Sequence, residues 1–85
     1  MRLTGTFLLQ SVFHGKNGRD YCDLLDSESG SVIKLTIPQE LQPPSFSTGL
    51  RFDLDAEIAV FDYQGQKSLT VREAEFSDMK NVFEV

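Results

Sequence analysis

The stretch "GLRFDLDAEIAVFDY", residues 49–63, alternates apolar and polar side chains along most of its length. The apolar side chains stand at even positions and the charged ones at odd positions: Leu50, Phe52, Leu54, Ala56, Ile58 and Val60 against Arg51, Asp53, Asp55 and Glu57. Successive side chains of a strand point to opposite faces, so this pattern predicts a half-buried strand with one acidic, solvated face. Ala59 and Phe61 make the second face apolar near its end. We expect that end to contact other protein.

Period-two alternation recurs on both sides of this stretch. The segments "LTGTFLLQSVF" (3–13), "RDYCDLL" (19–25), "SVIKLTI" (31–37) and "KSLTVREAEF" (67–76) each predict a strand. In the first segment the apolar positions change phase between Phe7 and Leu8, and a glycine precedes them. In the last they slip between Val71 and Ala74. Such slips indicate β-bulges or sharp bends.

The breaks between these segments are typical of turns. "HGKNG", "DSESGS" and "DYQGQ" contain residues that accept tight hairpin geometry, and only "PQELQPPSFSTG" (38–49) is long. Its two adjacent prolines exclude a long helix, although "PQEL" permits one turn. Five strands with the long connection between strands 3 and 4 predict an all-β, small Greek-key OB-type barrel. An SH3-like barrel is the alternative.

The size and composition predict one domain, residues 1–85, with a short C-terminal tail at 77–85. The chain is 40% hydrophobic and 25% charged, as in ordinary globular proteins. Its single cysteine, Cys22, argues against a disulfide-stapled secreted domain. The N-terminal segment has no long apolar run, and nothing approaches membrane-spanning length. We expect a cytoplasmic protein with no membrane association.

The net charge of −5 is unevenly distributed. In residues 1–52, five cations balance five acids, whereas residues 53–85 contain three cations and eight acids. An excess of acids argues against a general polyanion binder. The N-terminal part is neutral, however, and can present a positive face if its cations lie on one side.

The first hairpin, "VFHGKNGRDYC" (12–22), combines cations, turn residues and aromatic rings. Lys16 and Arg19 flank an Asn-Gly turn, Tyr21 lies two residues beyond Arg19, and Phe13 precedes the loop. Lys34 stands in the middle of a strand whose other face is apolar. A cationic track with flat rings is what single-stranded nucleic acid needs on an OB barrel. A solvated loop with rim aromatics is the alternative interpretation.

Three stretches, "GKNGRDY" (15–21), "SVIKLTIP" (31–38) and "PPSFSTGLRFDL" (43–54), resemble the single-stranded DNA-binding (helix-destabilising) protein of filamentous phages, a dimeric OB-fold protein. The segments "IKLTIPQELQPPSFS" (33–47) and "FDYQGQKSLTVREAEF" (61–76) also resemble small helicase-processivity proteins of Gram-positive conjugative elements. The phage resemblance implies that the first hairpin is a DNA-binding wing. It places wing contacts on Lys16, Gly18, Arg19 and Tyr21, and a strand contact on Lys34.

Other residues have ordinary explanations beside functional ones. The phage resemblance makes Tyr63, in the last hairpin turn, a candidate for the dimer contact or the DNA site, and exposure in a loop explains it equally well. Phe46 is expected to plug the barrel rather than stack on a base. Lys67 and Arg72 either support the DNA face or offset nearby acids across strands, and we favour the second for Arg72. Cys22 is expected in the core.

The sequence shows no motif for catalysis. With one histidine and one cysteine there is no paired metal-ligand spacing, and no phosphate-binding loop or nucleophile elbow occurs. We expect no enzyme activity, no cofactor, no metal and no small-molecule substrate.

These observations favour a single-stranded DNA-binding protein, a homodimer from a phage or mobile element, that coats DNA with little sequence preference. We place phosphates on Lys16, Arg19 and Lys34 and bases on Tyr21 and Phe13, and the dimer contact at Ala59 and Phe61. The alternative is a protein-binding module or nucleic-acid mimic that meets a basic partner through its acidic face, formed by Asp53, Asp55, Glu57 and Asp62.

Overall fold

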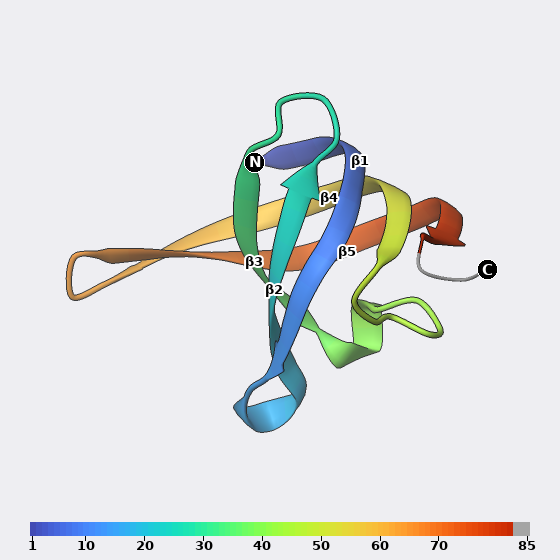
Figure 1. Cartoon of the computed structure of the whole chain (residues 1–85). Helices are drawn as coiled ribbons and strands as arrows, with labels where there is room; N and C mark the ends of the chain where they lie inside the picture. Colours follow the sequence, from blue (N-terminus) through green and yellow to red (C-terminus); the bar gives the residue numbers. More distant parts are fainter. Residues whose placement is uncertain (83–85) are drawn as a thin grey trace.

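The computed structural model describes residues 1–82, apart from the side chain of Tyr63, and folds them into a closed β-barrel (Figure 1). The strands neighbour one another in the order β1-β2-β3-β5-β4, and β4 closes on β1. This is the predicted OB-type barrel. The elements are β1 (Arg2–His14), η1 (Lys16–Gly18), β2 (Arg19–Asp26), β3 (Val32–Pro38), η2 (Gln39–Leu41), β4 (Leu50–Tyr63) and β5 (Gln66–Asn81).

Strand β1 is long because it serves two neighbours. Residues 2–8 pair with β4, and residues 7–14 pair with β2. The register with β2 shifts between Leu9 and Ser11, so the bulge lies later than the position between Phe7 and Leu8 at which the sequence placed it. Phe7 and Leu9 are both buried, and the phase of the strand changes only after them. Gly5 leaves room for the Phe7 ring, which a Cβ would meet at 3.3 Å.

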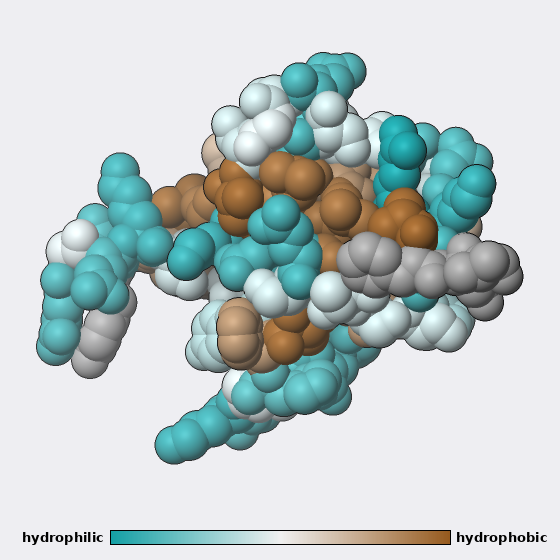
Figure 2. All heavy atoms as spheres, viewed as in Figure 1, coloured by the Kyte–Doolittle hydropathy of each residue, from teal (hydrophilic) through white to brown (hydrophobic). Residues whose placement is uncertain are grey.

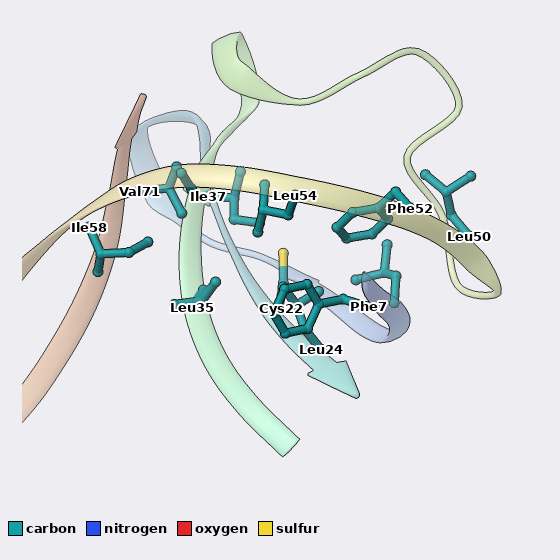
Figure 3. Close-up of a cluster of buried hydrophobic side chains, with 12 residues drawn as sticks. Phe7, Cys22, Leu24, Leu35, Ile37, Leu50, Phe52, Leu54, Ile58 and Val71 are labelled. Carbon is teal, nitrogen blue, oxygen red and sulfur yellow. The ribbon is translucent and has the colours of Figure 1, made fainter. Parts of the chain in front are cut away.

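The core is built from the inward face of every strand (Figure 3). The even positions of β4 from Leu50 to Ile58 are buried as predicted. Val60 is an exception, since it is half exposed on a part of β4 beyond the barrel. Phe46, from the connection between β3 and β4, packs its ring 6.0 Å from Phe52 and 5.9 Å from Phe76. The expectation that Phe46 packs on the core is confirmed.

The barrel closes weakly between β3 and β5. A single parallel bridge, Thr36 with Thr70, joins these two strands, whereas β4 and β5 pair along almost their whole length. The expected single turn after β3 is η2, and the two prolines that follow it lie outside any helix. The connection from β3 to β4 therefore contains no helix longer than η2 that could cover the seam between β3 and β5.

Strands β4 and β5 extend past the barrel as a two-stranded arm, residues 60–69, which projects to the left in Figure 1. In Figure 2 the outer end of this projection is hydrophilic, and hydrophobic surface lies between it and the barrel. At its other end β5 continues to Asn81, so residues 77–81 belong to the strand and not to the expected tail. Val82 then donates its N–H to the carbonyl of Gly49. Residues 83–85 lie outside the described part.

No helix within residues 1–82 is long and apolar enough to cross a membrane.

Candidate nucleic-acid interface

The wing, residues 12–22, owes its shape to two residues in the left-handed region. Asn17 has φ 62° and Gly18 φ 69°, conformations that asparagine and glycine adopt most readily. Gly15 closes the wing by donating its N–H to the carbonyl of Arg19 at 2.9 Å. Lys16 therefore lies on the exposed tip, and Arg19 begins the returning strand.

Gly15 also determines where the Tyr21 ring can lie. A Cβ at position 15 would come within 2.6 Å of the Tyr21 ring and 2.5 Å of the carbonyl oxygen of Arg19. The ring thus lies directly against the wing backbone at a site that only glycine leaves free. Tyr21 is nevertheless 53% exposed, so its ring packs against the wing backbone and is also open to solvent.

Strand register puts the two aromatic residues in one row. Phe13 is the cross-strand partner of Tyr21, Tyr21 of Thr36, and Thr36 of Thr70. Directly opposed residues share one face of a sheet. The row crosses four strands on the side of the sheet away from the core, because Cys22, the neighbour of Tyr21, points into the core; within the row Thr36 is only 6% exposed. Phe13 is 61% exposed, which leaves a second ring open to solvent.

A hollow of about 240 Å³, the first hollow, lies along this row. Three of the predicted contact residues, Phe13, Tyr21 and Lys34, line it. Lys34 comes from β3, one row further along, where it is the partner of Asp23. The remaining lining comes from β2, β3 and the root of the arm: Cys22, Asp23, Leu35, Thr36, Ser68 and Leu69.

The other predicted contact residues occupy different positions. Arg19 lies two residues before Tyr21 on β2 and lines a neighbouring hollow, while Lys16 lines neither. The side chain of Tyr63 lies outside the described residues. Throughout residues 1–82, Lys16, Arg19 and Lys34 form no ion pair, and all three are exposed. None of the three cations therefore has a carboxylate within ion-pair distance in the described part of the chain.

A buried carboxylate joins the wing to the connection after β3. Asp20 is 1% exposed and accepts hydrogen bonds from three side chains: Gln42 at 2.8 Å, Gln39 at 3.3 Å and His14 Nδ1 at 3.0 Å. Burial alone raises the pKa of Asp20, but the hydrogen bonds from Gln42, His14 and Gln39 outweigh it and hold the pKa below its ordinary value. Gln42 also donates to the carbonyl of Ile37. The root of the wing is thus fixed to β3 and η2.

Cys22 faces the core as predicted and is chemically quiet. Burial, with the negative charges of Asp20 and Asp23, raises the pKa of its thiol to about 12. The thiol lies 3.9 Å from the carbonyl oxygen of Asp20, to which it donates. A thiol with this pKa stays protonated at neutral pH and is a poor nucleophile.

The acidic face belongs to another part of the barrel. Its strand, β4, neighbours β1 and β5 and touches neither β2 nor β3 in the strand order. Three of its carboxylates are engaged by β1 and the N-terminus: Asp53 accepts from the Thr6 hydroxyl, Asp55 pairs with Arg2 at 2.7 Å, and Glu57 pairs with the N-terminal ammonium at 3.1 Å. Within the described residues, no group of three or more His, Cys, Asp or Glu side chains is arranged to hold a metal ion.

The sequence reasoning missed Asp20, and it weighed Arg72 for the DNA face but favoured a role in offsetting acids. Both residues left a signal. Asp20 stands two residues before Cys22, so the alternation that places Cys22 in the core also turns Asp20 inward. Arg72 lies within the phase slip of the last strand. In the structure it is exposed and, within residues 1–82, forms no ion pair.

Compared with family models, curated proteins and solved structures, the chain shows no match.

Proposed function

We propose that this protein binds single-stranded DNA on the outer face of β1, β2 and β3, between the wing and the arm. The observation that carries the proposal is the row of exposed rings, Phe13 beside Tyr21, with Lys34 in the same hollow. Unstacked bases gain flat surfaces from Phe13 and Tyr21, and phosphates gain cations from Lys34, Arg19 and Lys16. Contacts of this kind are made to phosphates and to the flat faces of bases, which every sequence offers. The binding should therefore show little sequence preference.

The distribution of charge supports this interface despite the net charge of −5. The three cations are exposed and unpaired within the described residues, whereas the carboxylates of β4 lie on a strand that touches neither β2 nor β3. The resemblance of "GKNGRDY" and "SVIKLTIP" to the phage DNA-binding proteins adds weight to the same residues. It also suggests a phage or mobile element as the source and replication or transfer of DNA as the process served.

A homodimer is part of the proposal. The arm exposes Phe61 and Val60 by about half each, and Ala59 lies beside them. An isolated two-stranded hairpin is marginally stable in water, so an arm with apolar side chains gains by packing on a partner. A second copy of this chain supplies such a partner. Sedimentation of the DNA-free protein at several concentrations tests this contact, and Phe61→Ser should shift the equilibrium toward monomer.

The direct test of DNA binding is a fluorescence titration with labelled oligo-dT of about 16 nucleotides, the upper end of the range for one OB fold. We expect micromolar or weaker affinity at physiological salt. The affinity should fall as salt rises, with a log–log slope of about −0.7 per phosphate contacted. A protein that binds no oligonucleotide even at low salt would refute the proposal.

The alternative function, an acidic module for a basic partner, draws on one observation. Across β4 and β5, Asp55 faces Glu75 and Glu57 faces Glu73, so carboxylates cluster on this sheet. It has less support because Asp55 and Glu57 already pair with Arg2 and the N-terminus. A pull-down partner lost with Asp53→Asn and Asp55→Asn, together with no oligonucleotide binding, would favour it.

A further inference from the structure

A second and larger hollow, of about 770 Å³, lies next to the first along the β3–β5 seam. Because β3 and β5 run parallel, the two strands advance together past their single bridge. Residues 34–36 and 68–69 line the first hollow, and residues 38 and 70–72 line the second. The wing tip, η2 and Phe61 of the arm complete its wall. The Thr36–Thr70 bridge thus lies between the first hollow and the second hollow.

The two hollows differ in charge. Lys34 and Asp23 line the first, so its ionisable side chains balance. Arg19 and Arg72 line the second against one acid, Glu40, which leaves it positive. Neither arginine forms an ion pair within residues 1–82. A guanidinium presents several donors in a fixed fork that suits phosphate oxygens, so the second hollow is the better place for a phosphodiester.

A bulge in the sheet aims Arg72 at this hollow. Glu57 pairs with Glu73 and the next residue, Ile58, pairs with Val71, so Arg72 has no cross-strand partner. An extra residue of this kind redirects its side chain relative to the regular strand. Without the bulge, the side chain of Arg72 would follow the regular inward–outward alternation of β5. With it, a cation of the acidic C-terminal part lines the same hollow as Arg19 of the wing.

We propose that a bound single strand crosses the Thr36–Thr70 bridge, with bases on Phe13 and Tyr21 in the first hollow and two successive phosphates in the second, one on Arg19 and one on Arg72. This inference rests on the proposed function and adds Arg72 to its site. Arg19 and Tyr21 lie two residues apart on one strand, about 7 Å at the usual rise. A stacked strand advances about 3.4 Å per nucleotide, so the two hollows serve positions about two nucleotides apart.

The test compares Arg72→Ala with Arg51→Ala on the full chain. Both variants remove one exposed arginine that forms no ion pair within residues 1–82, so both change the net charge equally. Arg51 lies on β4 opposite Lys80 of β5 and lines neither hollow. We expect Arg72→Ala to reduce the salt slope of oligo-dT binding by about 0.7, while Arg51→Ala leaves it unchanged. When salt rises from about 50 to about 200 mM, Arg72→Ala should therefore lose roughly 2.6-fold less affinity than the wild type loses.

Arg72→Lys keeps the charge and should restore the slope. Equal slopes for Arg72→Ala and Arg51→Ala, in proteins with wild-type melting temperatures, would overturn the inference while Tyr21→Ala still weakens binding. A lysine variant with the slope of the alanine variant would overturn the phosphate contact. A change in sedimentation of DNA-free Arg72→Ala with an unchanged slope would assign the hollow to a second copy of the chain instead. If the wild type binds no oligonucleotide, the proposed function fails and this inference fails with it.

Discussion

The carboxylate of Asp20 accepts a hydrogen bond from the side-chain amide of Gln42, with 2.8 Å between Oδ2 and Nε2. Asp20 belongs to the root of the wing, and Gln42 to the connection that follows η2. Because Gln42 also donates to the carbonyl of Ile37, one amide joins β2 to β3. Arg19 and Tyr21, the neighbours of Asp20, are placed by this contact on the outer face. Asp20 is thus a positioning residue for the proposed site.

Replacing Asp20 with asparagine should destabilise the protein by about 1–3 kcal/mol, the cost of leaving buried polar groups poorly paired. Asparagine removes the charge and replaces one carboxylate oxygen with an NH₂ group, which then faces either the donor of Gln42 or the donors of His14 and Gln39. Urea unfolding followed by circular dichroism measures the loss. Asp62→Asn, at an exposed position of the arm, is the matched control and should leave the urea midpoint unchanged. Equal midpoints for Asp20→Asn and the wild type would show that the contact contributes nothing.

The stability of the folded protein should also depend on pH through the carboxylate of Asp20. The pKa of Asp20 is lower in the folded than in the unfolded chain, despite burial, because Gln42, His14 and Gln39 donate to the charged form. The stabilisation is therefore fully present above the unfolded value of about 3.9 and is lost as the pH falls through the folded pKa. The urea midpoint of the wild type should drop more steeply below pH ~4 than that of Asp20→Asn. Parallel curves would contradict this.

Gly15→Ala should disturb the wing, although alanine can adopt the backbone conformation of position 15. The φ of Gly15 is −97°, which alanine accepts, but its Cβ would meet the Tyr21 ring and the carbonyl oxygen of Arg19. Either the ring or the turn must move, and we expect weaker oligo-dT binding. Gly30→Ala is the control: its φ of +74° strains alanine, yet nothing lies within 4 Å. It should lower stability by roughly 1 kcal/mol and leave binding intact. Equal affinities for both variants would contradict the role of Gly15.

The double change Lys16→Ala with Arg19→Ala should flatten the salt slope by about 1.4 units, since the proposed site gives each residue one phosphate contact. Arg51→Ala with Lys80→Ala is the control, because these cross-strand partners remove the same charge from another part of the barrel. Titrations of oligo-dT at several salt concentrations give both slopes. If the two double variants behave alike, the wing cations contribute only general charge.

Tyr21→Ala should weaken oligo-dT binding by about 1–3 kcal/mol and leave the salt slope unchanged, because in the proposed site the ring stacks on a base and meets no phosphate. Tyr21→Phe keeps the ring and should bind nearly as well as the wild type. Quenching of the fluorescence of labelled oligo-dT measures both affinities. An affinity of Tyr21→Phe as low as that of Tyr21→Ala would assign the effect to the hydroxyl and exclude stacking as its cause.

Cys22 should resist alkylation in the folded protein. Burial, Asp20 and Asp23 raise the pKa of its thiol to about 12, so the thiolate is scarce at pH 8. Because the folded pKa lies above the unfolded value of 9.0, folding retains the proton, and the thiol reduces stability only as the pH rises from about 9 toward 12. Mass spectrometry after iodoacetamide treatment should show labelling in urea but very little without it. Rapid labelling of the native protein would contradict this burial.

Much of the fold could be predicted because the pattern of burial is local. Alternation marked all five strands, and the Asn-Gly pair marked the wing turn that the structure contains. The errors lie where a strand departs from regular geometry. The β1 bulge follows Leu9 rather than Phe7, Val60 lies on the arm and is exposed, and residues 77–81 extend β5. Each of these depends on how far a neighbouring strand reaches, which no local pattern records.

The candidate site shows the same division. The residue types of the wing, two cations, a glycine turn and a tyrosine, were evident from the sequence, and so was the lysine of β3. Their arrangement required the register that sets Phe13 beside Tyr21 and Tyr21 beside Thr36. The clamp on Asp20 and the aim of Arg72 also emerged only in three dimensions. The partners of Asp20 come from β1 and from the connection after β3, and a bulge redirects Arg72.

The sequence by itself determined an all-β chain, its five strands, the inward face of β4 and a wing rich in cations, because periodicity and turn chemistry act between near neighbours. Tertiary structure alone decided which strands meet, that a single bridge closes β3 on β5, and that two hollows flank this bridge. The physical reason is that register and closure depend on the twist and reach of whole strands. These are properties of the packed barrel and of no single segment.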